Sequence, residues 1–320
     1  MPEITLDDIA RARTRIAGVA HRTPLEYARQ LSREHGRDVL LKLESFQVTG
    51  SFKLRGAMSK LSLLTADQRT RGVLTVSAGN HGLAVAHCAE ALGIKATIVV
   101  PASASRAKVE AIRRYPVTLI ERGANYDEAE RAAREMQRES GAVFVSPYND
   151  EDVIAGQGTI ALEILEDAPD VEAVIVPVGG GGLIAGVAIA AKTVKPDIKV
   201  YGVEPEASPT MSEALRAGRL IEIEERETIA DGLAGNIEPG SITFPIVQRL
   251  VDGVVLVTEE SIRDAISRVA REDHLMIEGS AAASIAALAD PLIEGRRVAA
   301  IITGRNITFE LLERVISQCP

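Results

Sequence analysis

Short apolar runs rich in β-branched residues alternate along this chain with longer stretches of helical periodicity. The runs that we predict as strands lie at 73–76, 96–101, 117–121, 142–147, 173–178, 199–205, 254–258 and 298–304. Helical stretches follow several of them, for example at about 82–92 and 126–140, in LIAGVAIAAKTV after 173–178, and after 254–258. Strands that alternate with helices predict parallel sheets built from βαβ units. Because one series of runs ends before residue 150 and another begins after 170, we predict two sheets in two domains, with a ligand cleft at the carboxyl ends of the strands.

The composition narrows the partners of the protein. A net charge of −9 and an isoelectric point of about 5.3 argue against sequence-independent binding of nucleic acid. The charged start lacks the apolar segment of a signal peptide, and no window is apolar for long enough to span a membrane. Cys88 and Cys319 stand in no metal-binding or redox spacing, and Cys88 is expected in the core. We therefore expect a cytoplasmic protein that acts on a small molecule, with neither nucleic acid nor a membrane as a partner.

A lysine in an unusual setting is the first candidate for chemistry. Lys53 lies in the apolar, glycine-flanked stretch ESFQVTGSFKLRGA at 44–57. The residues after it have helical spacing, and Ser51 is placed to cap this helix. The first turn is the positive end of the helix dipole, which disfavours the ammonium form, and a lysine held near neutrality suits Schiff-base chemistry. The alternative is a surface lysine whose stem covers apolar neighbours.

Two of three loops at strand ends could bind anions. The glycines and helix-start amides of SAGNHG, 77–82, could hold a carboxylate, although a turn with an asparagine cap gives the same pattern. Four consecutive glycines in PVGGGGLIAG, 177–186, cost chain entropy that a phosphate cradled by backbone N–H groups would explain. This second loop also satisfies a dinucleotide-binding pattern, with Glu204 ending the next strand, so an NAD-dependent oxidoreductase is an alternative.

The third loop, ITGRN at 302–306, offers the neutral hydroxyl of Thr303, which could equally be a capping threonine. Lys53 and the loops together fit one ligand. Lys53 would take an aldehyde, the glycines a phosphate and Thr303 a polar ring atom, which describes pyridoxal phosphate.

The ordered motifs S-F-K-x-R-G-A, S-A-G-N-H-G, G-G-G-G-L and T-G-x-N closely resemble those of the threonine dehydratase (ammonia-lyase) and serine racemase family of fold type II pyridoxal-phosphate enzymes. The likeness covers nearly the whole chain, including PYNDEDVIAGQGT at 147–159 and ETIADGLA at 227–234. It implies an α/β fold of two domains, each with a mostly parallel sheet flanked by helices, and a cofactor in the cleft between them. It also implies a large cofactor-binding domain of residues 1–65 and 147–320 and a small domain of residues 66–146.

The same resemblance assigns roles to single residues. Lys53 carries the cofactor and acts as the base for the substrate α-proton, Asn80 forms a hydrogen bond with the ring hydroxyl, and Thr303 faces the pyridine nitrogen. The positions implied for cofactor binding are Phe52, Lys53, Asn80, Gly179, Gly180, Gly181, Gly182, Leu183, Gly232, Glu278 and Thr303. Those implied for binding the substrate carboxylate are Ser77, Ala78, Gly79, Asn80 and His81.

The implied reaction is dehydration of L-threonine and L-serine to 2-oxobutanoate and pyruvate, with release of ammonia. A 3-hydroxyaspartate dehydratase, or another specialised 3-hydroxy amino acid dehydratase, is an alternative, and a serine racemase is a third. Racemases of the family have a serine where this chain has Ala78, facing the substrate from the side opposite Lys53. Because racemisation needs an acid–base group on each face, Ala78 favours a dehydratase. Thr303 also favours elimination, since a hydroxyl cannot hold the ring nitrogen as a firm cation.

Other features of the family pattern are altered in this chain. Family members that bind Mg²⁺ or Mn²⁺ use a glutamate at Glu204, a carbonyl at Ser208 and an aspartate where this chain has Thr210, so one anionic ligand is missing. Arg305 replaces a small glycine, and could close the pyridine side of the site or bind an anion. The chain ends soon after this loop, so we expect no regulatory domain of the kind that biosynthetic threonine dehydratases carry. We expect a homo-oligomer, either a dimer or a tetramer.

Overall fold

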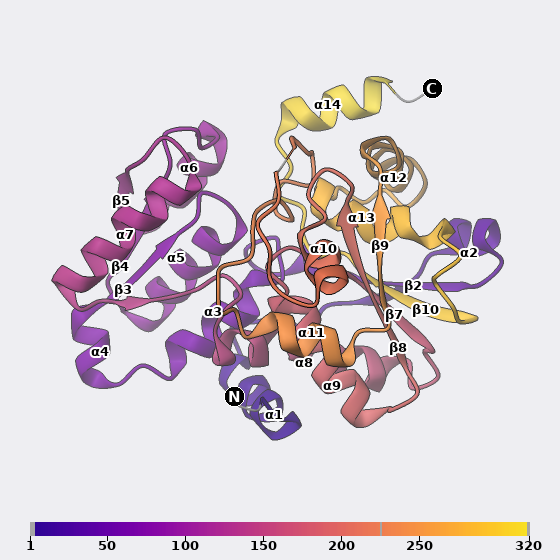
Figure 1. The fold of residues 1–320 in the computed structure, drawn as a ribbon, viewed down its shortest axis with the longest axis horizontal. Coiled ribbons are helices and arrows are strands. Elements are labelled where there is room, and N and C mark those ends of the chain that lie inside the picture. Colours follow the sequence, from indigo (N-terminus) through magenta and orange to yellow (C-terminus); the bar gives the residue numbers. More distant parts are fainter. Residues whose placement is uncertain (1–3, 225, 319–320) are drawn as a thin grey trace.

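The computed structural model describes residues 4–224 and 226–318, and its strands form two separate sheets (Figure 1). The larger sheet is parallel except at its edge, where β1 pairs antiparallel with β2. In spatial order its strands are β1 (Leu25–Tyr27), β2 (Asp38–Lys42), β10 (Arg297–Ile301), β7 (Ala173–Pro177), β8 (Lys199–Pro205) and β9 (Gly253–Val257). The prediction of two mainly parallel sheets is confirmed.

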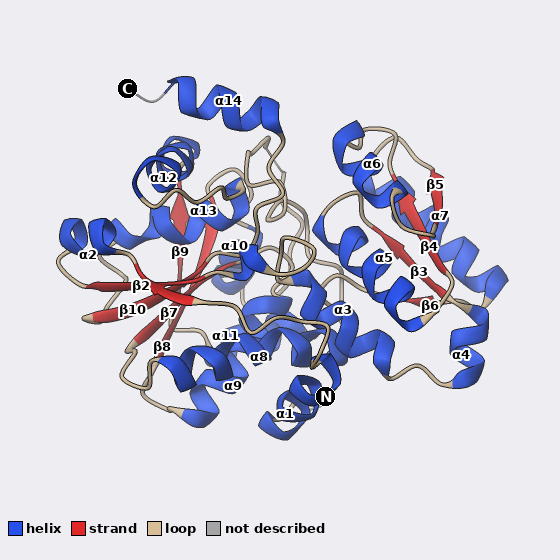
Figure 2. Ribbon diagram, turned by 180° about the vertical axis from the view of Figure 1, so that it is seen from behind, coloured by secondary structure: helices blue, strands red, loops and turns tan. Residues whose placement is uncertain are grey.

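Helices cover both faces of the larger sheet (Figure 2). One face packs against α1 (Leu6–Ile16), α8 (Glu151–Asp167), α9 (Gly182–Val194), α10 (Thr210–Ala217) and α11 (Thr243–Leu250). The other packs against α2 (Arg29–His35), α12 (Glu259–Glu272), α13 (Gly279–Ala286) and α14 (Phe309–Gln318). Because the strands are buried on both faces, β7 is apolar throughout: Val174 and Val176 enter the first core, and Ala173 and Ile175 enter the second.

The smaller sheet is entirely parallel. Its strands in spatial order are β5 (Thr118–Glu121), β4 (Ala96–Val100), β3 (Val73–Val76) and β6 (Val143–Phe144). Its neighbouring helices are α4 (Ala66–Arg71), α5 (Asn80–Leu92), α6 (Arg106–Arg113) and α7 (Tyr126–Ser140). The strands of this sheet all fall between residues 73 and 144, while the boundaries at 65/66 and 146/147 stay a prediction.

Every run predicted as a strand forms one, but one helix begins earlier than expected and another lacks its expected cap. Helix α5 begins at Asn80, which places Asn80 and His81 in its first turn. Helix α3 (Lys53–Ser62) does begin with Lys53, but the expectation that Ser51 caps it is wrong. Its N-cap residue is Phe52, without a side-chain hydrogen bond, and the buried hydroxyl of Ser51 has no partner among the described residues. The backbone of Ser51 instead forms a bridge with Gly304.

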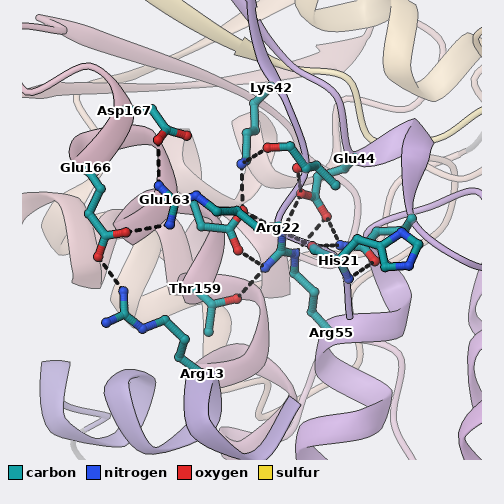
Figure 3. Close-up of polar contacts among 12 residues, drawn as sticks. Arg13, His21, Arg22, Lys42, Glu44, Arg55, Thr159, Glu163, Glu166 and Asp167 are labelled. Atoms are coloured by element: carbon teal, nitrogen blue, oxygen red, sulfur yellow. Dashed lines mark hydrogen bonds and ion pairs between the residues drawn. The ribbon is translucent and has the colours of Figure 1, made fainter. Parts of the chain in front are cut away.

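Helix α3 lies between the two sheets and is held by a cluster of four buried charges, the buried tetrad (Figure 3). The Arg55 guanidinium donates twice to Glu44, at 2.8 Å each, and to both oxygens of Glu163, at 2.6 and 2.8 Å. Lys42, at the end of β2, donates to Glu163 at 2.6 Å. Arg55 is 1% exposed, and the tetrad is neutral overall, with two acids and two bases. It ties the helix that carries Lys53 to β2 and α8.

Cys88 is buried in the core as predicted, whereas Cys319 lies outside the described residues. Across residues 4–224 and 226–318, no helix has both the length and the apolar character needed to cross a membrane.

Candidate active site

The predicted loops meet at the carboxyl ends of β3, β7 and β10, in the region between the two sheets. Asn80, at the start of α5, donates to Glu278 at 2.7 Å and accepts from Asn306 at 2.6 Å. The glycine loop reaches the same region through Gly179, which lies against the backbone of Gly232. Gly232 in turn donates to the hydroxyl of Ser280, two residues beyond Glu278. The structure therefore brings residues far apart in the sequence into one connected region.

Lys53 sits partly buried at the first position of α3. Its Nζ donates to the carbonyl of Pro147 at 2.9 Å and lies 5.1 Å from the centre of the Phe52 ring. Burial lowers the pKa of Lys53 to about 8, and the charge of Glu278 opposes that shift. A substantial fraction of Lys53 is therefore neutral near physiological pH, as a nucleophilic or basic lysine requires.

The glycine loop lies at the start of α9, where an anion could bind. The helix begins at Gly182, so its first N–H groups have no acceptors within the helix and carry the positive end of its dipole. Gly181 has φ +85°, and a Cβ at Gly180 would overlap the ring of Tyr148. Thr243 fixes the loop by donating to the carbonyl of Gly180 at 2.8 Å. Only glycine fits at these two positions, and the loop presents backbone amides as a phosphate group requires.

Thr303 carries an unsatisfied polar group in the site. Its residue is 2% exposed, and its hydroxyl has no hydrogen-bond partner in the described structure. Buried hydroxyls are usually paired, so the Thr303 hydroxyl is able to form a hydrogen bond with a ligand placed beside it. The main chain of Thr303 accepts from Phe52 N at 3.0 Å, which ties this loop to the start of α3. A ring nitrogen placed at Thr303 would satisfy the hydroxyl, so the residues present fit pyridoxal phosphate.

The side chain of His81 is occupied away from the predicted carboxylate site. Its Nε2 lies 3.0 Å from the carbonyl of Val145, which can only accept, so Nε2 donates and Nδ1 keeps a lone pair. Burial, with the nearby charge of Lys53, lowers the pKa of His81 to about 3. The imidazole is therefore neutral, and His81 can contribute to carboxylate binding only through its backbone amide. Ser77 accepts from Gly79 N at 3.1 Å and so shapes the same loop.

The residues predicted as cation ligands do not fit a divalent ion. Both oxygens of Glu204 accept from the start of α10, from Met211 N at 2.7 Å and from the amide and hydroxyl of Ser212 at 2.8 and 2.7 Å. Burial raises the pKa of Glu204 to about 7, which opposes the charged form that a cation needs. Thr210 donates to Gly235 O at 3.0 Å. Within the described ranges, no three His, Cys, Asp or Glu side chains gather into a metal site.

Sequence reasoning missed Asn306 and Tyr148. Both stand within quoted motifs, TGRN and PYNDEDVIAGQGT, so a signal was present without a role attached to it. Asn306 lies beside Asn80, and Tyr148 packs under the glycine loop and accepts from Glu238 N at 3.0 Å. Their roles depend on contacts between residues distant in the chain.

The region between the two sheets combines a lysine of lowered pKa, a glycine loop with available backbone amides, and an unpaired hydroxyl. This combination is typical of an enzyme that binds a phosphorylated carbonyl cofactor. Comparison with known proteins makes this class specific. Residues 16–304 match the family described as pyridoxal-phosphate dependent enzymes, and the chain belongs to that family. Its fold is fold type II, and pyridoxal phosphate is its cofactor.

Known relatives include both lyases and racemases. The L-threonine ammonia-lyase of Thermotoga maritima is 46% identical over 316 residues, which cover 98% of this chain and 79% of that protein. The structure of maize serine racemase has a TM-score of 0.92 and 36% identity, covering 98% of this chain and 97% of the racemase. The processed threonine deaminase isoform 2 of Solanum lycopersicum has the same TM-score, 0.92, and 36% identity, covering 98% and 86%. Overall shape therefore does not separate the two activities.

The depressed pKa of Lys53 has a measurable consequence for cofactor loading. Only the neutral amine can attack the aldehyde, so the rate at which apo-protein takes up pyridoxal phosphate should rise about tenfold per pH unit and level off above about pH 8. A lysine at its ordinary pKa of 10.5 would give a rate that keeps rising well beyond that point. Stopped-flow absorbance of the cofactor, followed from about pH 6 to pH 10, distinguishes the two profiles.

Proposed function

We propose that the protein is a pyridoxal-phosphate dependent ammonia-lyase that converts L-threonine to 2-oxobutanoate and L-serine to pyruvate, each with one ammonia. The lyase reading is supported by 46% identity to an L-threonine ammonia-lyase. The observation that carries it is Ala78, at the end of β3 in the loop proposed to hold the substrate. Its methyl group cannot donate or accept a proton.

Lys53 is the proposed base. When neutral, its Nζ takes the α-proton of the substrate, and the Pro147 carbonyl keeps the amine oriented. The amides at the start of α5, with the Ser77–Gly79 loop, would hold the substrate carboxylate. The bound cofactor supplies an electron sink for the charge left on the α-carbon. Thr303 would offer the ring nitrogen of the cofactor only a hydroxyl, which does not hold that nitrogen as a cation. Less negative charge is then delocalised into the ring, which favours rapid loss of the β-hydroxyl of the substrate.

Ala78 separates a lyase from a racemase. A proton removed by Lys53 can return only from the side it left, so the wild-type protein should form 2-oxo acid from L-serine with little or no D-serine. Ala78→Ser adds a hydroxyl to the opposite side and should introduce measurable D-serine while deamination continues. Chiral chromatography beside a 2-oxo acid assay follows both products. Rapid D-serine formation by the unmodified protein would overturn the lyase assignment.

A cavity lined by two arginines supports one second candidate, a 3-hydroxyaspartate dehydratase. Arg114 and Arg305 line it together with Glu90 and with Asn306, which contacts Asn80, and two guanidiniums there would favour an acidic side chain. Purified holoenzyme should be assayed for 2-oxo acid and ammonia on L-threonine, L-serine and the 3-hydroxyaspartates. A larger kcat/KM for L-threonine than for any 3-hydroxyaspartate supports the first proposal, and the reverse order replaces it with the second.

We further propose that the protein is a cytoplasmic homo-oligomer. Large apolar side chains are exposed near the carboxyl ends of β2 and β10, where Phe46, Val48 and Phe309 follow these strands in sequence. Met276 precedes Glu278, whose amide donates to Gly304 beyond β10. An interface between copies would cover these side chains.

A further inference from the structure

Glu278 is a buried glutamate whose carboxylate is turned away from the helix it precedes. It stands at the N-cap position of α13, yet its side chain makes no capping hydrogen bond. Its Oε1 instead accepts from Asn80 Nδ2 at 2.7 Å, and its Oε2 accepts from the backbone N of Asn306 at 3.1 Å. A Cβ at Gly304 would overlap Oε1, so glycine leaves room for this arrangement.

The amide of Asn80 is oriented without ambiguity by these neighbours. The Nδ2 group of Asn306 donates both to the carbonyl of Thr49, at 3.0 Å, and to Asn80 Oδ1, at 2.6 Å. The oxygen end of the Asn80 amide therefore faces a donor, and its nitrogen end faces a carboxylate. One Nδ2 hydrogen of Asn80 is used by Glu278, and the second is left for another acceptor.

This arrangement favours Glu278 in its ionised form. Each carboxylate oxygen accepts from an N–H donor, and these two hydrogen bonds are stronger when the carboxyl group is charged. Burial and the charge of Asp231 raise the pKa of Glu278 to about 7, while the Asn80 hydrogen bond and Lys108 oppose the shift. When ionised, Glu278 also favours protonation of Lys53. An ionisable group is therefore kept in the interior at the point where it meets Asn80.

We propose that Glu278 and Asn306 are positioning residues that lock the Asn80 amide, so that its free Nδ2 hydrogen is presented to the ring oxygen of pyridoxal phosphate. This inference rests on the proposed assignment of Asn80 to that oxygen. Asn80 belongs to α5, which follows β3 of the small sheet, whereas Glu278 precedes α13 and Asn306 follows β10 of the large sheet. The hydrogen bonds among the three residues therefore form only when the parts of the chain that carry the two sheets are packed together.

The test is a double-mutant cycle on cofactor binding, which needs no turnover. Glu278→Gln keeps the shape but places an amide nitrogen against one of the two donors, so the affinity of apo-protein for pyridoxal phosphate should fall about 10-fold to 100-fold, with a shifted absorption maximum of the bound cofactor. In an Asn80→Ala background the same substitution should change the affinity by less than about twofold, because its target is gone. Additive losses would overturn the proposal, as would Asn80→Ala binding the cofactor like wild type.

Asp231→Asn is the matched control, because it also removes one negative charge near Glu278 but touches neither asparagine. Its side chain is 59% exposed and pairs with Lys108. Affinity for pyridoxal phosphate should stay within about twofold of wild type, as is usual for an exposed ion pair. If Glu278→Gln fails to fold by urea denaturation, Asn306→Ala runs the same cycle with the same expected non-additivity. The cycle measures the affinity for pyridoxal phosphate and needs no substrate. A failure of this proposal is therefore distinguishable from a failure of the proposed function, which would appear as absence of lyase activity on every hydroxy amino acid.

Discussion

Lys53→Ala should lower kcat for L-threonine deamination by about 10⁴-fold or more, the largest effect expected of any single change in this chain. The substitution removes the proposed covalent attachment point of the cofactor and, in the part of the chain that the structure describes, the amine that donates to the Pro147 carbonyl. The glycine loop and Thr303 remain, so pyridoxal phosphate should still bind without covalent linkage. Ammonia release measured on the purified variant checks the loss.

Lys60→Ala is the matched control for that experiment. Lys60 lies on the same helix, but its ammonium pairs with Asp150 and Asp152 at 2.7 and 3.1 Å, away from the cleft. Its removal should change kcat by less than about threefold, because a partly exposed ion pair contributes little. If Lys53→Ala retained ammonia release close to that of Lys60→Ala, the assignment of Lys53 as base would be wrong.

Arg55→Met should lower the free energy of unfolding by about 3–5 kcal/mol, because it leaves buried carboxylates without their main partner. Glu44 then loses both of its ionic hydrogen bonds, and Glu163 keeps only Lys42. Methionine fills much of the volume, so the loss reports charge rather than a cavity. Urea denaturation followed by circular dichroism measures the change.

Arg22→Met provides the comparison on the rim of the same cluster (Figure 3). Arg22 pairs with Glu166 and Asp167 at 2.6 Å each, but its side chain is 49% exposed. Its loss should cost only about 0–1 kcal/mol. Equal unfolding midpoints for the two variants would show that the buried tetrad does not stabilise α3 as we describe.

The sequence predicted those parts of the fold that local patterns control. Apolar runs such as 173–176 form strands because a parallel sheet covered on both faces needs uninterrupted apolar residues. The loop of four glycines at 179–182 stood out for a similar reason, because consecutive glycines are a strong local signal, while its role in cofactor binding stays a prediction. The pattern missed β1 and β2, where β2 ends in a charged Lys42 that suggests a solvent-facing position. Nothing local indicates that Glu44 and Glu163 neutralise the charges of Lys42 and Arg55 in the interior.

In the candidate site, too, local motifs were informative and long-range contacts were not. The motifs pointed to Lys53, Asn80, the glycine loop and Thr303, but they did not indicate which residues hold these groups in place. Asn80 meets Glu278 and Asn306 across 198 and 226 residues of chain. The expected Ser51 cap failed because the Ser51–Gly304 bridge and the Phe52–Thr303 hydrogen bond fix the approach to α3 instead. Such contacts arise only when the two sheets are assembled.

The most direct test of the account is the identity of the residue that carries the cofactor. Holoenzyme should be treated with borohydride, which reduces the lysine–cofactor linkage to a stable bond, and its tryptic peptides should be mapped by mass spectrometry. We expect the added mass of reduced pyridoxal phosphate on the peptide that contains Lys53, in near-stoichiometric amount, and no such mass in Lys53→Ala. Stoichiometric labelling of another lysine, such as Lys42 or Lys60, with Lys53 unmodified would contradict it.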